Sequence, residues 1–218
     1  VFCSEEREII RQLERCHLDQ YMYIDSLFES SNKALLLDVQ YRMSNQIGDM
    51  VSSLFYDGQL RNGRDEDSTD PLSWISYNPT KQWPNQQEEN RERPRIFNKD
   101  ECEIIFDLVT EIQSSKPEMT IGIITPYKAQ ATLLKKAIKQ SENIKIDTVD
   151  GFQGKECDVI IFSVTRTNGL YRFLADERRL NVALSRARDR IIIVGCKEYA
   201  KDNNLLSDIM EYCTVYNQ

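Results

Sequence analysis

Closely spaced cysteines, histidine and long apolar runs are what this 218-residue sequence has least of. Its six cysteines, at positions 3, 16, 102, 157, 196 and 213, form no CxxC pair, and histidine occurs once. Zinc sites need closely spaced Cys and His ligands, so we predict no metal-binding residues in the chain. Isolated cysteines in apolar stretches behave as small hydrophobic residues, which indicates free thiols in an intracellular protein.

Apolar runs such as residues 159–162 are far shorter than the roughly 20 residues that cross a bilayer, so the sequence predicts no membrane span. The first eleven residues carry three glutamates where a secretory signal would be basic and then apolar, and we expect no signal peptide. With 40% hydrophobic residues, 8 glycines and 6 prolines, the composition is typical of a globular protein with a substantial core. We therefore expect an intracellular location, cytoplasmic or nuclear, away from membranes.

The net charge of −7 argues at first against nucleic-acid binding, because phosphate affinity comes from Lys and Arg. The charge is unevenly distributed, however. Residues 145–195 hold nine Lys/Arg and seven Asp/Glu, a net of +2, so the rest of the chain carries −9. An acidic body with one slightly basic region is compatible with a groove that binds nucleic acid.

Hydrophobic periodicity predicts strands alternating with helices. Several strands are continuously apolar, as in residues 191–194, which is typical of a parallel sheet covered on both faces. We therefore predict a three-layer α/β fold with a mostly parallel sheet. Strands are expected at 35–38, 72–77, 120–125, 145–148, 158–165 and 190–195. Helices are expected at 5–16, in a second stretch that continues to 28, and at 45–55, 98–112, 127–140, 176–187 and 197–212. Asn98 and Glu101 have the spacing of a reciprocal helix cap.

The domain organisation expected from this pattern is a helical lead-in at residues 1–34 followed by one domain at 35–218. Between about 57 and 97 the periodicity fails, and this region holds both tryptophans and four of the six prolines. We predict an irregular surface excursion there that contains one strand.

Residues 40–43, Gln-Tyr-Arg-Met, form the first segment whose side chains could bind a ligand. They follow a predicted strand, and ligands of parallel sheets bind at the carboxyl ends of strands. Tyr41 and Arg42 would there present a ring and a guanidinium to a nucleotide. The alternative is that Tyr41 packs inward and Arg42 pairs with Asp38.

Two further segments could contact phosphates. In residues 148–156, Gly151 and Gly154 allow the backbone to approach a phosphate or sugar, although such spacing also occurs in ordinary turns. In residues 178–188, helical spacing puts Arg179 and Arg186 on one side, although a solvated basic face has the same pattern. No GxxxxGK[ST] phosphate loop is present, so we expect no tight binding of Mg·ATP by this chain alone.

Four blocks taken in order resemble the signature motifs of the second RecA-like domain of superfamily 1 helicases, group 1B, which includes senataxin and the nonsense-mediated-decay helicase. The blocks are residues 40–43, Thr125-Pro126-Tyr127 with Gln130, residues 148–156 and residues 174–188. The resemblance implies a RecA-like, P-loop-NTPase-type fold that lacks its own phosphate loop. One departure is that Ser44 and Asn45 replace the His-Pro usual in the family; both are helix-capping residues, so the helix start is expected to survive.

The resemblance also implies a nucleotide site. In such helicases ATP and Mg²⁺ lie between two RecA-like domains, and the first domain supplies the phosphate loop and the Mg²⁺ ligands. By this resemblance Arg42 and Arg186 would be catalytic and reach the γ-phosphate, with Arg186 as the arginine finger. The implied nucleotide-binding residues are Gln40, Tyr41 stacked on adenine, Gly154 allowing close approach, and Glu156 accepting from the ribose.

A track for single-stranded DNA or RNA is implied in the same way. Hydroxyls and backbone amides would hold phosphates with little sequence information. The implied residues are Thr125, Pro126, Tyr127, Thr148, Asp150, Thr165 and Arg166. The implied partners are the single strand and the N-terminal RecA-like domain of the same protein.

The leading hypothesis is therefore the C-terminal motor domain of an ATP-dependent DNA or RNA helicase, inactive without its N-terminal partner domain. The alternative is a non-catalytic RecA-like module that binds protein or nucleic acid. A small-molecule phosphotransferase would need a complete phosphate site within these residues, and the sequence contains none.

Overall fold

The computed structural model describes residues 38–64, 70–83, 95–169 and 174–218. The chain divides into two units, Val1–Leu37 and Asp38–Gln218. The first unit lies outside the described residues, and so do the lead-in at 1–34, its two predicted helices and nearly all of the predicted strand at 35–38. The second unit is described below.

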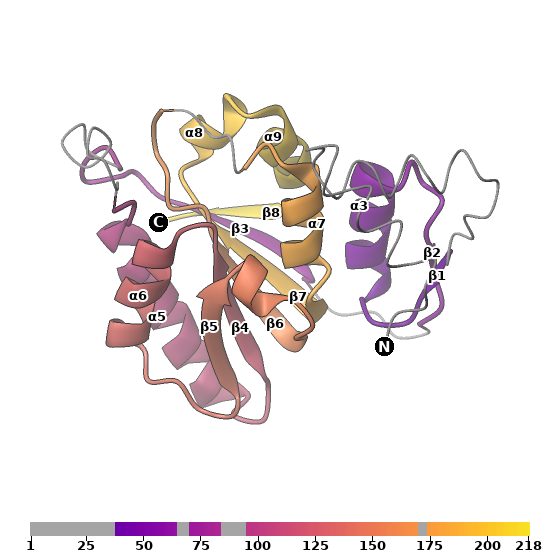
Figure 1. Cartoon of the computed structure of the whole chain (residues 1–218), viewed down its shortest axis with the longest axis horizontal. Coiled ribbons are helices and arrows are strands. Elements are labelled where there is room, and N and C mark those ends of the chain that lie inside the picture. The colour runs from indigo at the N-terminus through magenta and orange to yellow at the C-terminus, as the bar shows by residue number, and fades with distance from the viewer. Residues whose placement is uncertain (1–37, 65–69, 84–94, 170–173) are drawn as a thin grey trace, which may run out of the picture. The chain divides into compact units, whose positions relative to one another are not determined.

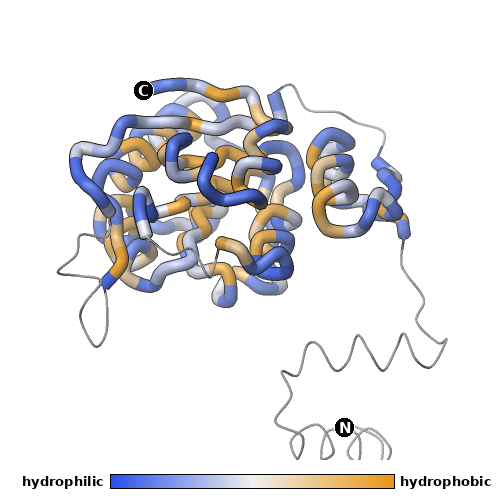
Figure 2. The backbone as a smooth tube through the Cα atoms, turned by 90° about the horizontal axis from the view of Figure 1, so that it is seen from above, coloured by the Kyte–Doolittle hydropathy of each residue, from blue (hydrophilic) through white to orange (hydrophobic). Residues whose placement is uncertain are grey.

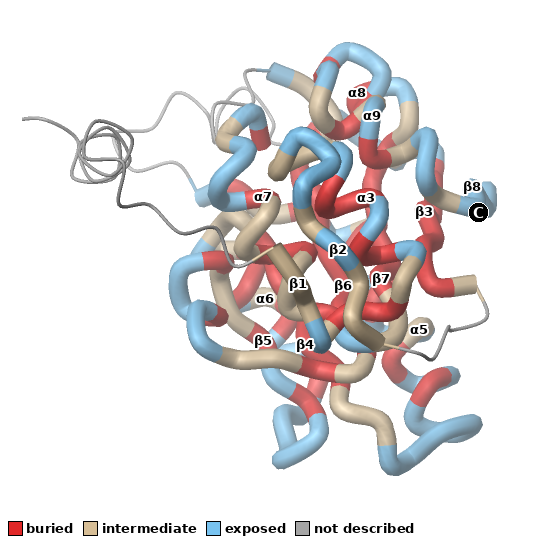
Figure 3. Tube along the Cα trace, turned by 90° about the vertical axis from the view of Figure 1, so that its right-hand side faces the viewer, coloured by how far each residue is buried: buried red, intermediate tan, exposed pale blue. Residues whose placement is uncertain are grey.

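A six-stranded sheet forms the middle of the second unit (Figure 1), in the order β5-β4-β6-β7-β3-β8. Its strands, all paired in parallel, are β3 (Leu72–Ser76), β4 (Ile121–Thr125), β5 (Ile144–Thr148), β6 (Cys157–Ser163), β7 (Ala187–Val194) and β8 (Thr214–Asn217). In register, Ile123 of β4 lies beside Ile161 of β6, which lies beside Ile192 of β7. The predicted parallel sheet with buried central strands is thus confirmed, and Figure 3 shows these strands in red.

Helices cover both faces of this sheet (Figure 1). On one face, α5 (Lys99–Ser115) packs on β6 and β7, and α6 (Lys128–Ala137) packs on β4 and β5. On the other face, α7 (Glu177–Leu184) packs on β6, and α3 (Asn45–Phe55) contacts both β7 and α7. Two short helices, α8 (Lys197–Lys201) and α9 (Asn204–Glu211), continue that layer. The predicted three-layer α/β fold is therefore the observed one.

Apolar residues at helical spacing explain how α5 docks. Cys102, Ile105, Val109 and Ile112 are buried along one side of α5. Figure 2 shows such hydrophobic stretches in orange, alternating along the helices with blue polar ones. No helix in the described ranges has the length and apolar character needed to span a bilayer.

Two predicted helices are wrong in their extent. The helix predicted to reach residue 187 ends at Leu184, and the chain enters β7 at Ala187. Arg186 therefore lies outside the helix and does not extend a helical face with Arg179. The helix predicted at 197–212 is broken at Asn203, whose side chain accepts a hydrogen bond from the Leu206 amide (3.1 Å) and caps α9.

Part of the expected irregular excursion at 57–97 is regular, and its second strand is buried. It contains β2 (Arg61–Asn62) and β3, and β3 lies inside the sheet between β7 and β8. Trp74 and Trp83 are 0% and 1% exposed, so the prediction of a surface segment is wrong at both tryptophans. The indole of Trp74 donates to the Gly195 carbonyl (2.9 Å), a partner 121 residues away that local sequence does not indicate.

Candidate nucleotide and nucleic-acid sites

Two arginines, Arg42 and Arg188, pair with Glu156 at the amino ends of β6 and β7. Arg42 Nε lies 2.7 Å from Glu156 Oε2, and Arg42 Nη1 donates to the Ser185 carbonyl (3.0 Å). Arg188 pairs with the other oxygen of Glu156 and also contacts Asp158 (3.5 Å). The hydrogen bonds from Arg188 and Arg42 hold the pKa of Glu156 below its usual range. Glu156 is therefore an ionised bridge between two guanidinium groups.

Arg186 adds a positive charge that has no carboxylate partner among the described residues. Its Nε donates to the Val182 carbonyl (2.9 Å), and this bond fixes the guanidinium beside α7. Partial burial and the nearby charge of Arg42 hold the pKa of Arg186 below its usual value. Arg42 and Arg186 repel each other, and Glu156 is the carboxylate that interacts with both of them. An anion between them would relieve that repulsion.

The cluster opens onto a cavity of about 510 Å³ lined by Tyr41, Arg42, Arg64, Glu156, Asp158, Arg188 and Asp189. Arg64 was not predicted from the sequence, because it lies in the region 57–97, where the sequence shows no motif. It pairs with Asp189 (2.6 Å) and donates to the carbonyls of Arg42 (3.1 Å) and Arg188 (3.0 Å). Arg64 thereby fixes the backbone on either side of the cavity.

A shift in strand register aims Arg188 at this cavity. From Cys157 to Val159 on β6, the paired positions on β7 run from Ala187 to Arg190, so β7 holds one extra residue there. Such bulges redirect side chains. Arg188 lies within the bulge and reaches Glu156.

Residues 40–43 are placed differently from the prediction. Gln40 belongs to β1 (Val39–Gln40), whose partner among the described strands is β2, in a separate two-stranded sheet. Arg42 consequently reaches the amino ends of β6 and β7, and the expected position at a carboxyl end of the main sheet is wrong. The inward-packing alternative is also wrong, because Tyr41 is 74% exposed and Arg42 pairs with Glu156.

Gln40 organises the turn that carries Tyr41 and Arg42. Its side-chain oxygen accepts from the amides of Arg42 (2.9 Å) and Met43 (2.7 Å), and its Nε2 donates to Asn62 (2.8 Å). Gly63 lies under the Tyr41 ring, where a Cβ atom would overlap Tyr41 Cε1. Gln40 therefore acts through the turn and is not one of the residues that line the cavity.

Gly151 and Gly154 lie in the connection between β5 and β6, on either side of the end of the short 3₁₀ helix η1 (Asp150–Phe152). Gly154 has a φ of +81°, a left-handed conformation that favours glycine. A Cβ atom on Gly151 would overlap the Asp147 carboxylate. The structure does not include Gly154 among the residues that line the cavity, although Glu156 follows it by two positions.

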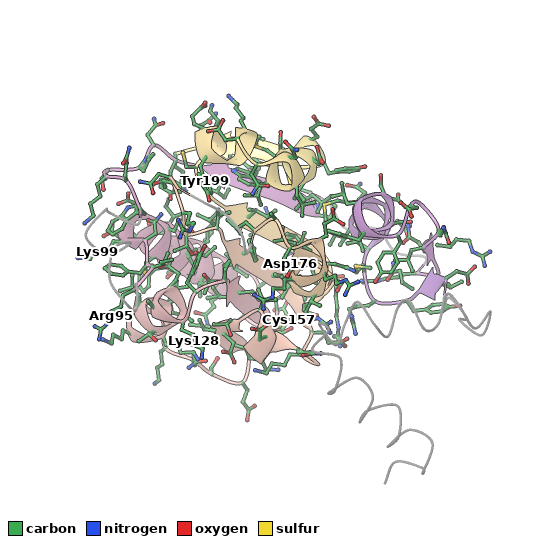
Figure 4. The ribbon with its side chains drawn as sticks, turned by 45° about the horizontal axis from the view of Figure 1, so that its top comes forward. Arg95, Lys99, Lys128, Cys157, Asp176 and Tyr199 are labelled. Carbon is green, nitrogen blue, oxygen red and sulfur yellow. The ribbon has the colours of Figure 1, made fainter. Side chains whose placement is uncertain are left out.

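A second group of predicted residues lies at the opposite, carboxyl ends of the strands. Thr125 ends β4 beside Thr148, its register partner on β5, and its hydroxyl is 3.0 Å from that of Thr165. Arg166 donates to the Tyr127 hydroxyl (2.8 Å). Pro126 lies between Thr125 and Tyr127, and the exposed Asp150 begins η1. Figure 4 labels Cys157, where β6 begins near the first group, and Lys128, which follows Tyr127 in the second.

Glu101 lies beneath the second group and is 0% exposed. Its carboxylate accepts from the Thr165 amide (2.9 and 3.0 Å), the Ser163 hydroxyl (2.6 Å) and the Tyr77 hydroxyl (3.0 Å). Burial raises the pKa of Glu101 to about 8. The sequence identified Glu101 only as half of a reciprocal cap. Asn98 does accept from the Glu101 amide (3.1 Å), but the Glu101 side chain turns inward, so the reciprocal half is wrong.

The Glu101 network holds Thr165 in an unusual backbone conformation. Thr165 has a φ of +73°, which is strained for a β-branched residue. Glu101 accepts from its amide, and Asn98 Nδ2 donates to its carbonyl (3.0 Å). These buried bonds fix the direction in which the chain continues to Arg166.

A family profile described as an AAA domain matches residues 18–198. The chain belongs to this family, the C-terminal region of Sen1-like superfamily 1 helicases. Among curated proteins, "DNA polymerase alpha-associated DNA helicase A" of Saccharomyces cerevisiae is 32% identical over 96% of this chain and 34% of its own length. "Helicase sen1" of Schizosaccharomyces pombe is 34% identical over 87% of this chain and 12% of its own length.

A crystal structure titled as the C-terminal domain of a possible DNA helicase from Lactobacillus plantarum supports the same fold. It has a TM-score of 0.54 and 16% identity, and the match covers 81% of this chain and 98% of that one. This superfamily 1 helicase domain spans about a third or less of the length of the curated relatives named above.

Proposed function

We propose that this domain is the C-terminal motor domain of an ATP-dependent helicase acting on DNA or RNA. The observation that carries the proposal is the pair Arg42 and Arg186, whose charges repel each other while both interact with the Glu156 carboxylate; Arg42 lines the Glu156 cavity, and Arg186 lies outside its lining. A triphosphate supplies the anion that such a pair needs. The relatives named as helicases favour this anion over others.

Arg186 is proposed as the arginine finger, and Arg42 as a second γ-phosphate contact. A guanidinium stabilises the charge that develops on the phosphoryl oxygens, an effect of roughly 10³ to 10⁵ in rate in related chemistry. The Val182 carbonyl orients Arg186 before nucleotide arrives, so little rearrangement is required. Arg42 would exchange part of its contact with Glu156 for phosphate.

The remaining nucleotide roles follow from the same cavity. Tyr41, largely exposed beside it, is proposed to stack on adenine, and Glu156 to accept from the ribose once Arg42 has turned to phosphate. Gln40 is proposed to fix the turn that carries Tyr41. Gly154 is proposed to let the backbone pass close to the nucleotide.

ATP would be held mainly by a second domain. The sequence contains no phosphate loop, and no group of three metal-ligating side chains occurs in the described ranges. These residues do not fit a Mg²⁺ site, and we assign no Mg²⁺ ligand to them. We propose that the N-terminal RecA-like domain of the same protein provides the phosphate loop and the ligands of Mg²⁺, which supplies charge neutralisation when bound.

The second group is proposed as the single-strand track. Thr125, Thr148, Thr165 and Arg166 lie at neighbouring strand ends. Thr125 and Thr165 are fully buried, so they are proposed to fix the backbone whose amides hold phosphates. The half-buried Thr148 and the 8% exposed edge of Arg166 are proposed to contact phosphates directly. Pro126, Tyr127 and Asp150 would flank them. Closing of the cleft around ATP would then move the track relative to the other domain.

Binding of single strands tests the track. We expect this chain to bind dT15 or rU15 weakly in a fluorescence anisotropy titration, and the affinity to fall steeply between about 50 and 200 mM salt. Arg166→Ala should weaken binding several-fold and lower the salt slope by about 1, because the variant neutralises one phosphate fewer. Arg61→Ala, which removes an exposed arginine paired with Asp38, serves as the matched control. Binding independent of salt would contradict the track.

Gly63→Ala tests the role of Tyr41. The added methyl group would force the Tyr41 ring away, so the KM for ATP of the full-length protein should rise roughly three- to tenfold through loss of stacking. In a Tyr41→Ala background the same substitution should have no further effect. A double-mutant cycle on KM measures this coupling, and additive effects would argue against stacking by Tyr41.

The alternative of a non-catalytic module makes a different prediction about the rest of the gene. A helicase requires a phosphate loop and an acidic strand end within about 300 residues upstream, as usual domain sizes dictate. Their absence from the upstream sequence would favour the module.

A further inference from the structure

A second groove lies beside the proposed track, between α6 and the residues before α5. It has a volume of about 650 Å³ and is lined by Arg95, Phe97, Lys128, Ala129, Thr132, Leu133 and Lys136. Figure 4 shows Arg95 and Lys128 on the same side of the molecule, with Lys99 near them. None of the sequence motifs includes this groove.

Buried hydrogen bonds hold the two walls of the groove together. Gln130 of α6 accepts from the Asn98 amide (2.8 Å) and donates to the Asn98 carbonyl (3.2 Å). It also donates to the Ser163 hydroxyl at the end of β6 (3.1 Å). The segment that carries Arg95 and Phe97 is therefore fixed against α6 by groups that are fully buried. The shape of the groove is thus determined by the core of the fold.

The charge of the groove is of one sign. Three of its lining residues are cationic and none is acidic. Among the described residues no ion pair involves Arg95, Lys128 or Lys136, whereas Lys135, on another side of α6, approaches Asp147 (3.9 Å). Cations around an apolar floor suit a ligand with both phosphates and flat apolar faces.

The groove is continuous with the proposed track at two points. Lys128 directly follows Tyr127, whose hydroxyl accepts from Arg166. On the other wall, the Phe97 ring packs on Trp83 with centroids 5.5 Å apart. The Trp83 backbone is bonded to Thr167, the residue after Arg166 (2.7 and 2.8 Å). A single-stranded nucleic acid that continues past Arg166 would place its next phosphates in the groove.

We propose that this groove binds the continuation of the single nucleic-acid strand, with the two lysines and Arg95 on phosphates and Phe97 against a base. The proposal rests on the proposed function and extends its binding path beyond the residues implied by the family motifs. An acidic peptide would match the cations, but it would leave the aromatic floor and the continuity with Arg166 without a role.

Charge reversal tests the groove. For the double variant Lys128→Glu/Lys136→Glu, we expect the affinity of this chain for dT15 or rU15 to fall about tenfold or more in anisotropy titrations. The salt slope should fall by about 2, one for each phosphate that the lysines no longer bind. The matched control is Lys116→Glu/Lys139→Glu, which makes the same change in net charge at two exposed lysines outside the groove. Unchanged thermal midpoints in both variants would show that folding is intact.

Phe97→Leu separates stacking from charge. Leucine keeps an apolar side chain but removes the ring, so we expect the quenching of 2-aminopurine placed within the oligonucleotide to decrease and the affinity to fall several-fold.

The outcomes distinguish this inference from the proposed function. If Arg166→Ala weakens binding and the groove variants behave like the control, the groove proposal is wrong and the track stands. If only the groove variants weaken binding, the groove stands and the track is wrong. Retained strand binding with lost binding of poly-glutamate would assign the groove to an acidic partner and overturn the proposal. No binding of any strand by the unmodified chain would overturn both.

Discussion

Replacing Arg186 with alanine in the full-length protein is expected to lower nucleic-acid-stimulated ATP hydrolysis by roughly 10³ to 10⁵ in kcat. The substitution removes the charge that the Val182 carbonyl aims into the space beside Arg42. Folding should be preserved, because Arg186 contributes no ion pair within the described residues. The effect should therefore appear in kcat, with only a small change in the KM for ATP. Steady-state ATPase assays with saturating single strand measure both.

Two control variants make this test specific. Arg186→Lys keeps the charge but loses the planar fork and its geometry, so we expect only partial recovery. Arg61→Ala removes an exposed arginine paired with Asp38 and should leave turnover unchanged. If Arg186→Ala retains stimulated turnover, the arginine-finger assignment fails. If the unmodified full-length protein shows no stimulated turnover, the non-catalytic module becomes the better hypothesis.

Glu101→Ala is expected to destabilise the domain by at least about 3 kcal/mol. The substitution leaves the Thr165 amide and the hydroxyls of Ser163 and Tyr77 buried without their acceptor. It also releases the strained φ of Thr165, so Arg166 should lose its fixed position. Urea unfolding at constant pH measures the loss of stability.

The pH dependence of stability provides a separate test of Glu101. Its carboxyl pKa is about 8 in the folded domain, against a usual value of 4.5. Between these pH values the unfolded chain has released a proton that the folded chain retains. The unfolded state binds fewer protons, so the free energy of unfolding should fall by roughly 1 kcal/mol per pH unit from about pH 5 to 8 and level off above.

Glu101→Gln should remove this dependence, because glutamine does not titrate and is neutral, like the protonated Glu101 carboxyl below about pH 8. Urea unfolding of both proteins from about pH 5 to 9 compares the slopes. Equal slopes would show that another group is responsible.

The parallel sheet could be predicted because its strands are long apolar runs. Residues 121–124, 159–162 and 191–194 have a pattern that is typical of a sheet covered on both faces. The strand β8 could not be predicted in this way. It is short and exposed, and it exists because Trp74 and its neighbours on β3 offer a free edge.

The candidate site was predictable in composition but not in placement. The motifs predict two sets of residues, but the separation of these sets to opposite ends of the sheet depends on β1 pairing with β2 and on the bulge at Arg188. Both are tertiary features. Arg64 and the groove lysines carry no local signal, and Glu101 matches a helix cap as well as it matches a buried acceptor.

Strand β6 connects the two groups of proposed site residues and can transmit a movement from one to the other. β6 begins directly after Glu156 and ends two residues before Thr165, so seven strand residues, about 23 Å of extended chain, separate the proposed nucleotide and nucleic-acid ends. The strand is buried and paired on both sides. We expect β6 to move as a rigid element, because a strand in a packed core does not shorten or bend independently of its neighbours. A tilt imposed at the Glu156 end would therefore displace Thr165 and Arg166 as one body. In the proposed helicase, the distance moved along the nucleic acid would be set by the position of the domain's pivot.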